Sequence, residues 1–574
     1  MKNNSKTSTA KIIVDTLIEN NVKTIFGYPG AAVIPIFDEL LENREKIHHV
    51  LVRHEQAAVH MADSYARITG KPGVCIATSG PGATNLITGI ANAHLDSVPL
   101  IAIAGQVPTN KIASDAFQES DMMGITLPIT KHNFQIRKPE DAKEIILKAI
   151  KIANQGRPGP VYIDIPVDMQ KAKINPPKKN HTKIPGFNTV TKGNAKQIKL
   201  AADLIRKAKK PVFFIGGGVI KSNASSELKK IVDITKIPVV TTLMGKSAYP
   251  EDDDLCLGMV GMQGRKCANF AVQKSDLLII TGSRLSDRSV GKFNEFSAGS
   301  KKIHIDIDPA EIGKNISIDV PIVGDAKSVL EDLYYELSKN TFPKNNSSWK
   351  ESMIRLNKEC CCSLNISSEK ISAKKVIYEL EKIITEKDII VTGVGQHQIF
   401  AAHFLKTKKP GTFITSGGLG TMGYGLPAAI GAKIGSPEKR VFLLDGDGSF
   451  QMTAQELATI KQEKIKIIPI IFNNSYLGMV AQWLRLFKNN RMSNVYLGKN
   501  PDFVKLAESF SLKGIRVDDP EKIRDAIQKS IESAGTMIVE IEVDPEENIL
   551  PMISSGNSLD KLFGPCITDN YFKQ

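Results

Sequence analysis

The chain has 574 residues, of which 42% are hydrophobic and 24% charged, and its formal net charge is +14. This length exceeds what one hydrophobic core supports and favours three or four domains of a soluble globular protein. The lysines are dispersed, with no basic stripe interleaved with aromatic residues, so the charge does not indicate a nucleic-acid partner. The uncharged segment 72–95 is interrupted by glycine, proline, asparagine and serine, so it does not predict a membrane span.

Cysteine usage bears on the compartment. The seven cysteines are odd in number, form no CxxC pair, and include an adjacent run at 360–362 that is poorly spaced for a tetrahedral zinc site. We therefore expect free thiols in a reducing compartment. The first 21 residues lack the apolar core of a signal peptide, so the cytoplasm is the expected location, with synthesis inside an organelle such as a plastid as the alternative.

The first part of the chain, 1–170, alternates helical patterns with short apolar runs. The strand candidates lie at 24–29, 48–52, 73–79, 99–105 and 160–166. This alternation predicts a doubly wound parallel α/β sheet. A stretch rich in proline, lysine and asparagine follows at 171–195 and is predicted to be a linker.

The same alternation recurs twice more. A central domain is predicted at 196–338, with strands at 211–218, 238–243, 276–282 and 301–308. After a second predicted linker at 339–370, a third domain at 371–574 has strands at 388–395, 411–417, 440–448, 465–474 and 535–544, followed by a short tail. The predicted fold class is therefore α/β, with three doubly wound parallel sheets in series.

A metal site is predicted in the third domain. Two apolar runs, 441–444 and 465–472, flank a helical pattern at 453–461, as in a parallel strand–helix–strand unit. Asp447 and Asn474 then lie at the carboxyl ends of both strands, which is the ligand-binding edge of an open sheet. Their hard oxygen atoms suit Mg²⁺.

The residues around Asp447 predict an anion site. Gly446 and Gly448 allow close backbone approach, and Ser449 follows at the predicted start of a helix, an arrangement suited to phosphate. GLGTMG at 418–423 also satisfies the GxGxxG pattern, so a dinucleotide site is the alternative. Alone, that pattern is weak, and the acidic residue it needs would be Asp445, which falls inside the metal-site motif.

Glu55 follows the strand candidate at 48–52 and begins a helical pattern. Such a glutamate is usually a favourable charge at a helix N-terminus. The functional interpretation is a buried carboxyl group that meets a basic nitrogen of a ligand.

Taken together, several motifs carry a resemblance. GDGSF…NN, RHEQAAVHMADSYAR (53–67), TSGPGATN (78–85) and SGGLGTMGYGLPAAIGA (416–432) resemble thiamine diphosphate enzymes of the pyruvate-oxidase/acetohydroxyacid-synthase group. GQVPT, SDAFQE, GRPGPVYIDIP, HIDIDPAEIGKN, GVGQHQ and GMVAQW narrow this to the anabolic acetohydroxyacid synthase catalytic subunits, over about residues 7–555.

The resemblance implies a thiamine diphosphate site built from two chains. Mg²⁺ would bind Asp447, Asn474 and the backbone carbonyl of Tyr476, and the diphosphate would contact Val394, Gly395, Gln396, His397, Gly446, Gly448 and Ser449. Glu55 from another chain would donate to the aminopyrimidine ring. Met422 would force the cofactor into its bent shape, and the carbonyl of Gly420 would accept from its amino group.

The same resemblance implies the reaction and a second cofactor. Pyruvate would be decarboxylated, and its two-carbon unit would be condensed with pyruvate or 2-oxobutyrate. Trp483 and Arg288 would shape the acceptor pocket, while Gln118 and Phe117 would line its entrance. FAD would bind the central domain through Arg157, Gly217, Asp306 and Asp325, in a largely structural role.

Further implications concern assembly and rivals. A homodimer or homotetramer is expected, with a small regulatory subunit as a further partner. Val167 and Gln263 depart from the usual family residues, lysine and histidine respectively. The alternatives are a catabolic acetolactate synthase, which lacks flavin and the acceptor tryptophan, a pyruvate oxidase with redox-active flavin, and a non-catalytic homologue.

Overall fold

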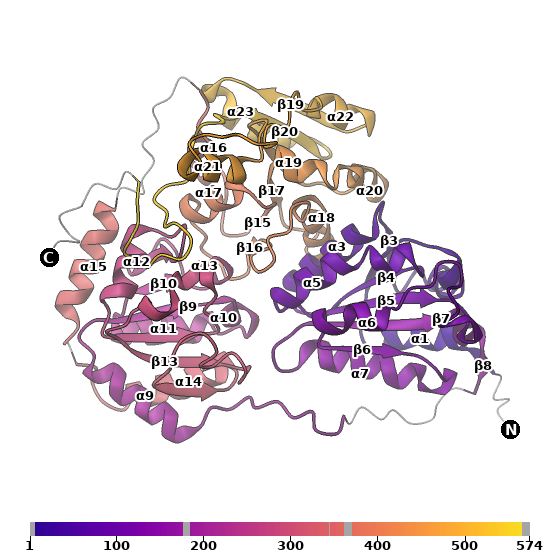
Figure 1. The fold of residues 1–574 in the computed structure, drawn as a ribbon, viewed down its shortest axis with the longest axis horizontal. Helices are drawn as coiled ribbons and strands as arrows, with labels where there is room; N and C mark the ends of the chain where they lie inside the picture. Colours follow the sequence, from indigo (N-terminus) through magenta and orange to yellow (C-terminus); the bar gives the residue numbers. More distant parts are fainter. Residues whose placement is uncertain (1–5, 176–183, 344, 361–369, 565–574) are drawn as a thin grey trace.

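The computed structural model describes residues 6–175, 184–343, 345–360 and 370–564, and it contains three α/β units in series (Figure 1). Each unit is built on one six-stranded sheet of parallel strands. Alternate residues of a central strand enter different cores: Phe213 packs with one set of helices and Val212 and Phe214 with the other. Helices therefore cover both faces of the sheet, and the predicted fold class is confirmed.

The first sheet has the strand order β3-β2-β4-β5-β7-β6. Its strands are β2 (Thr24–Gly27), β3 (His48–Leu51), β4 (Gly73–Ala77), β5 (Leu100–Gln106), β6 (His132–Gln135) and β7 (Pro160–Pro166). The helices are α1 (Thr9–Glu19), α2 (Ile34–Glu42), α3 (Glu55–Thr69), α4 (Pro81–Thr84), α5 (Ile87–Leu95), α6 (Met122–Thr126), α7 (Ala142–Asn154) and α8 (Val167–Lys171). Beyond α8, β8 (Lys173–Ile174) pairs antiparallel with β1 (Thr7–Ser8), so the chain stays with this unit past the predicted boundary at 170.

The central sheet has the order β11-β10-β9-β12-β13-β14. Its strands are β9 (Pro211–Ile215), β10 (Val239–Thr241), β11 (Cys256–Met259), β12 (Leu277–Thr281), β13 (Lys301–Asp306) and β14 (Val320–Val323). The helices are α9 (Ala195–Lys207), α10 (Gly217–Lys221), α11 (Ser225–Thr235), α12 (Lys266–Lys274), α13 (Asp287–Val290), α14 (Ala326–Ser338) and α15 (Ser347–Glu359).

The third sheet has the order β16-β15-β17-β18-β20-β19. Its strands are β15 (Ile389–Thr392), β16 (Phe413–Ile414), β17 (Val441–Gly446), β18 (Ile468–Asn473), β19 (Lys513–Val517) and β20 (Met537–Glu542). The helices are α16 (Ala373–Glu381), α17 (Gln396–Phe404), α18 (Gly425–Gly435), α19 (Asp447–Gln451), α20 (Leu457–Glu463), α21 (Gly478–Phe487), α22 (Phe503–Ser509) and α23 (Ile523–Glu532).

In the three six-stranded sheets, the sequence patterns missed four strands, β6, β11, β14 and β19, and all four are edge strands. An edge strand has one neighbour only and is less enclosed by helices, so it does not need a continuous apolar run. β19, with the sequence KGIRV, has only one buried residue, and β6, with the sequence HNFQ, also has one. Apolar runs therefore revealed all the inner strands but only two of the six edge strands, β3 and β16.

The second predicted linker, 339–370, contains helix α15, whose formation the lysine- and asparagine-rich composition had not indicated. Trp349, Met353 and Leu356 recur at helical spacing and pack on the core of the central sheet. The C-terminal segment also returns to this unit, since Ile553 and Leu559 join the same core (Figure 1). Residues 176–183 of the first linker and 361–369 of the second lie outside the described residues.

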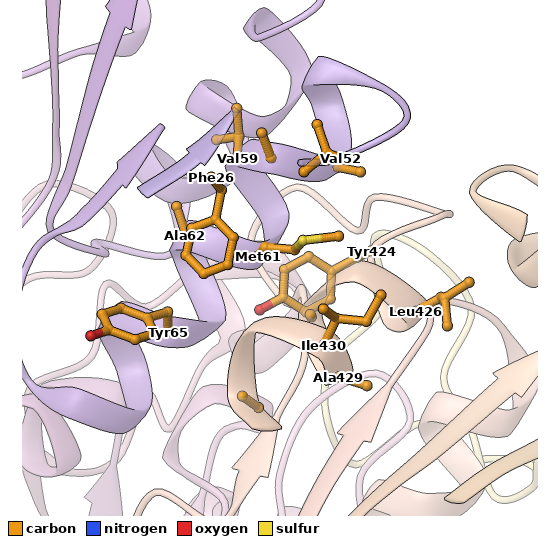
Figure 2. Packing of buried hydrophobic residues seen from close by; sticks show 14 of the residues in the cluster. Phe26, Val52, Val59, Met61, Ala62, Tyr65, Tyr424, Leu426, Ala429 and Ile430 are labelled. Carbon is orange, nitrogen blue, oxygen red and sulfur yellow. The ribbon is translucent and has the colours of Figure 1, made fainter. Parts of the chain in front are cut away.

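The first and third units share one core, centred on helices α3 and α18 (Figure 2). Met61 and Tyr65 from α3 join the same cluster as Tyr424, which directly precedes α18, and Ile430, which lies within α18. The two helices approach closely because Gly431 has no side chain: a Cβ there would lie 2.1 Å from the carbonyl oxygen of Met61. This contact fixes where the loop before α18 lies, and that loop borders the candidate site.

Candidate active site

The predicted metal residues meet at the carboxyl edge of the third sheet. β17 and β18 are parallel neighbours, and Gly446 pairs with Phe472, so Asp447 and Asn474 leave the sheet side by side. A cavity of about 80 Å³ opens there. Its lining includes eleven residues predicted for thiamine diphosphate and its metal: Val394, Gly395, Gln396, His397, Met422, Gly446, Asp447, Gly448, Ser449, Asn474 and Tyr476.

Hydrogen bonds hold the oxygen atoms of this cavity in place. Asn500 Nδ2 donates to Asp447 Oδ2 at 2.6 Å, and the backbone N–H of Tyr476 donates to Asn474 Oδ1 at 2.9 Å. Burial raises the pKa of Asp447 to about 6. Sequence reasoning missed Asn500, because it belongs to a loop without any motif and reaches Asp447 only through the fold.

Gln396 and His397 begin helix α17 directly after β15. Gln396 Nε2 donates to Gln482 Oε1 at 2.9 Å and to the carbonyl of Glu547 at 3.0 Å. Burial lowers the pKa of His397 to about 3, so its imidazole is neutral at physiological pH. Its buried Nε2 atom has no hydrogen-bond partner among the described residues.

These residues fit a Mg²⁺-bound diphosphate. The donor set consists of a carboxylate, an amide oxygen and a nearby backbone carbonyl, and contains no sulfur. The glycines keep the cavity open, because a Cβ on Gly446 would lie 2.7 Å from the His397 ring. His397 Nε2 forms no hydrogen bond among the described residues, and it lies 3.5 Å from Asp445 Oδ1.

A second, larger cavity of about 630 Å³ lies where the central unit faces the other two. Its lining contains the four residues predicted to bind the flavin, which are Arg157, Gly217, Asp306 and Asp325. It also contains Arg288 and Gly420. Gly420 was expected beside the thiamine cofactor, but it lines this cavity and not the smaller one. Gly420 has a φ of +72°, and the chain passes from the larger cavity to the smaller one between Gly420 and Met422.

The larger cavity fits a dinucleotide in size and charge. Its volume lies within the range of about 300–1,000 Å³ usual for ligand sites. Gly216 and Gly282 allow the ends of β9 and β12 to touch, since a Cβ on Gly216 would lie 2.2 Å from the carbonyl oxygen of Gly282. Two basic residues that line the cavity, Lys221 and Arg284, were not predicted, because neither belongs to a recognisable sequence motif.

Acidic groups in the larger cavity are held by hydrogen bonds and ion pairs. The Arg157 guanidinium contacts Glu311 at 2.6 Å and Asp308 at 3.3 Å. Burial raises the pKa of Asp306 to about 6. Asp325 caps helix α14 by accepting from two backbone N–H groups. The larger cavity therefore contains basic side chains that suit phosphate groups and carboxylates that suit ribose hydroxyl groups, both of which FAD carries.

Four predicted residues, Glu55, Phe117, Gln118 and Trp483, line neither cavity. Glu55 begins α3 and accepts a hydrogen bond from Asn85 Nδ2 at 2.9 Å. Gln118 lies against Gly80 in an adjacent loop, with a φ of +60° and with Phe117, 88% exposed, beside it. Trp483, on α21, packs against the central core and contacts the Phe487 ring at 5.2 Å. Within one chain, the structure therefore does not bring these residues together with Asp447.

Comparison with known proteins assigns each unit to a domain of the thiamine pyrophosphate enzymes. Residues 7–125 match the N-terminal TPP binding domain, 198–333 the central domain and 393–541 the C-terminal TPP binding domain. The match over 393–541 covers both GDGSF…NN and GLGTMG and names thiamine pyrophosphate binding, not dinucleotide binding.

Curated relatives cover nearly the whole chain. A probable acetolactate synthase large subunit of Methanocaldococcus jannaschii is 48% identical over 565 residues, which is 97% of this chain and 95% of the relative. An acetolactate synthase large subunit of Corynebacterium glutamicum is 47% identical, and the match covers 96% of this chain and 89% of the relative. An acetolactate synthase large subunit of Pyropia yezoensis is 45% identical, and the match covers 98% of this chain and 96% of the relative. The chain belongs to the acetolactate synthase large-subunit family of thiamine pyrophosphate enzymes.

Proposed function

We propose that this chain is an acetolactate synthase catalytic subunit in valine, leucine and isoleucine biosynthesis. It decarboxylates pyruvate and joins the two-carbon unit to a second pyruvate, giving 2-acetolactate, or to 2-oxobutyrate, giving 2-aceto-2-hydroxybutyrate. The observation that carries this proposal is the smaller cavity, where Asp447 and Asn474 meet at the carboxyl edge of a sheet matched to a TPP binding domain.

In this proposal, thiamine diphosphate supplies a nucleophilic carbon and an electron sink for decarboxylation. Asp447, Asn474 and the Tyr476 carbonyl hold Mg²⁺, and Gly446, Gly448 and Ser449 offer backbone and hydroxyl groups to the diphosphate. Asn500 orients the Asp447 carboxylate toward the ion. His397 is neutral, so it contributes a hydrogen bond rather than a charge.

Glu55 donates a proton to the aminopyrimidine ring and so keeps the cofactor in its reactive tautomer. The residues that line the smaller cavity all lie between 373 and 547, in the third unit. Glu55 lies on the first unit and outside this lining, which supports a site completed by the first unit of a second copy. The proposal therefore includes a homodimer at least, and Asn85 holds the Glu55 carboxyl group in position.

For the acceptor, Arg288 is well placed to bind a carboxylate. Its side chain is 65% exposed and lines the larger cavity, with one guanidinium N–H directed at Met262 Sδ at 2.8 Å. Its Nε atom lies 3.8 Å from Asp287 Oδ2 in an exposed ion pair, and the planar guanidinium group is suited to a two-pronged contact with the carboxylate of a 2-oxo acid. Trp483 and Gln118 are proposed to shape the acceptor pocket and its entrance in the assembled dimer.

The larger cavity is proposed to hold FAD, with Arg157, Gly217, Asp306 and Asp325 among its contacts. No net redox change occurs in the reaction, so the flavin organises the junction between the three units. Gln263, which replaces a usual family histidine, lines this cavity and donates to Met479 Sδ at 3.3 Å. That contact ties the flavin cavity to helix α21, which carries Trp483.

Assembly and location complete the proposal. The relatives are named large subunits, which supports pairing with a smaller regulatory subunit. Among the described residues, Cys75, Cys256, Cys267 and Cys360 are buried and form no disulfide, which supports a reducing compartment such as the cytoplasm; Cys361, Cys362 and Cys566 lie outside the described residues. Among the described residues, no helix combines the length and apolar character needed to cross a membrane.

The test is formation of acetolactate from pyruvate by purified protein, with thiamine diphosphate, Mg²⁺ and FAD each omitted in turn. Omission of thiamine diphosphate or Mg²⁺ should abolish product, and added 2-oxobutyrate should yield the second product. Bleaching of the flavin by pyruvate, with acetate formed in place of acetolactate, would identify a pyruvate oxidase instead. Absence of any turnover with all three cofactors present would overturn the proposal.

A further inference from the structure

The loop 416–423 separates the two cavities. Ser416, Gly418 and Gly420 line the larger cavity, whereas Met422 lines the smaller one. The Ser416 hydroxyl oxygen accepts hydrogen bonds from the backbone N–H groups of Gly420 at 3.1 Å and Thr421 at 2.9 Å. One buried hydroxyl group thus closes the turn that carries Gly420 and presents Met422.

The first unit of the same chain holds that hydroxyl group. Asn92, on helix α5, is fully buried, and its Oδ1 atom accepts from Ser416 Oγ at 2.5 Å and from Thr421 Oγ1 at 3.2 Å. Asn92 Nδ2 in turn donates to Asp63 Oδ2 at 3.4 Å. The direction of each hydrogen bond is therefore set: Ser416 must donate to Asn92, and its lone pairs face the two backbone N–H groups.

A second contact from the end of α5 anchors the first half of the loop. Asp96 Oδ1 accepts from the N–H of Gly418 at 2.7 Å. Gly418 fits directly against α5, because a Cβ there would lie 2.9 Å from Leu95 Cβ and 2.7 Å from Asp96 Oδ1. The loop thus rests on the first unit through both its backbone and its Ser416 side chain.

From this geometry we infer that Ser416 and Asn92 are positioning residues that set the shape of the Met422 turn across the boundary between the first and third units. The inference rests on the proposed function, since it assigns the turn to the central part of thiamine diphosphate. The diphosphate end is held by residues outside the loop, at Asp447, Asn474 and Gln396. Loss of the Ser416 hydroxyl group should therefore weaken binding of the whole cofactor while leaving its diphosphate end unaffected.

The experiment compares two ligands on the full-length apoprotein by calorimetric titration in the presence of Mg²⁺: thiamine diphosphate and inorganic diphosphate. In Ser416→Ala, the Kd for thiamine diphosphate should rise about 10-fold, because the backbone N–H groups of Gly420 and Thr421 lose their acceptor. The Kd for inorganic diphosphate should stay within about twofold of the wild-type value. Thr421→Val, which is close in size and removes only the longer contact to Asn92, should give a smaller loss with the same selectivity.

Ser436→Ala provides a matched control. Ser436 is also a buried serine of the third unit, but its hydroxyl group bonds only to Glu438, at 2.7 Å, away from the loop. Both Kd values should be unchanged in this variant. In the double variant Ser416→Ala/Asn92→Ala, the loss should be less than the product of the single losses, because both residues act through one hydrogen bond.

The outcomes separate this inference from the proposed function. Wild-type protein that binds no thiamine diphosphate would overturn the proposed function itself. Wild-type binding with unchanged affinity in Ser416→Ala would overturn the positioning role. An equal loss for both ligands in Ser416→Ala and Thr421→Val would also overturn it, because that result would indicate a general structural defect.

Discussion

Arg67 links the first and third units, and we expect its removal to lower the free energy of unfolding. Its guanidinium lies 2.7 Å from an Asp63 oxygen and 2.8 Å from an Asp96 oxygen, and donates to the carbonyl of Thr415 at 3.0 Å. Both aspartate side chains are fully buried, and the arginine side chain is 13% exposed. Arg67→Met keeps most of the packing volume but leaves two buried carboxylates without their cation, which should cost about 3–5 kcal/mol.

Urea unfolding, followed by far-ultraviolet circular dichroism, measures this loss. Since a chain of three units need not unfold in one step, the first transition is the relevant one. Arg44→Met provides the comparison, because the Arg44 and Glu45 side chains are 75% and 92% exposed and 3.9 Å apart. Such an exposed pair contributes about 0–1 kcal/mol. A first transition in Arg67→Met that matches that of Arg44→Met would refute the reasoning.

Three further predictions concern activity and pH. Glu55→Gln should lower kcat at least about 100-fold while thiamine diphosphate still binds, because the amide cannot transfer a proton; full turnover in a pyruvate assay would contradict this role. Trp483→Leu should lower the ratio of 2-aceto-2-hydroxybutyrate to 2-acetolactate when both acceptors compete, and an unchanged ratio would remove Trp483 from the acceptor pocket. Burial raises the pKa of Glu456 to about 7, from an ordinary value of 4.5. The folded state then retains a proton that the unfolded state releases, so stability should fall as pH rises from about 4.5 to 7. Glu456→Gln should flatten this slope in urea titrations at pH 5 and pH 8, and an equally steep slope would show that other groups cause it.

The sequence by itself determined the inner strands and the metal-binding edge. Asp447 and Asn474 are linked by one strand–helix–strand unit, and such short crossovers almost always place consecutive parallel strands with their carboxyl ends together. Buried inner strands also require continuous apolar runs, so they can be recognised without knowing their neighbours. The motif spacing predicted that Asp447 and Asn474 meet beside Gly446, Gly448 and Ser449, whereas the family resemblance implied the other side chains of the smaller cavity.

Only the tertiary structure decided which distant side chains complete each cavity. Asn500 reaches Asp447, and Asn92 reaches Ser416, across separations of 53 and 324 residues. No local periodicity encodes such contacts. The Asn92–Ser416 contact depends on the close approach of the first and third units at α3 and α18, which Gly431 permits, and the Asn500–Asp447 contact depends on the path of a loop within the third unit. Gly420 lines the larger cavity for the same reason: the path of its loop is fixed by the first unit against which it packs.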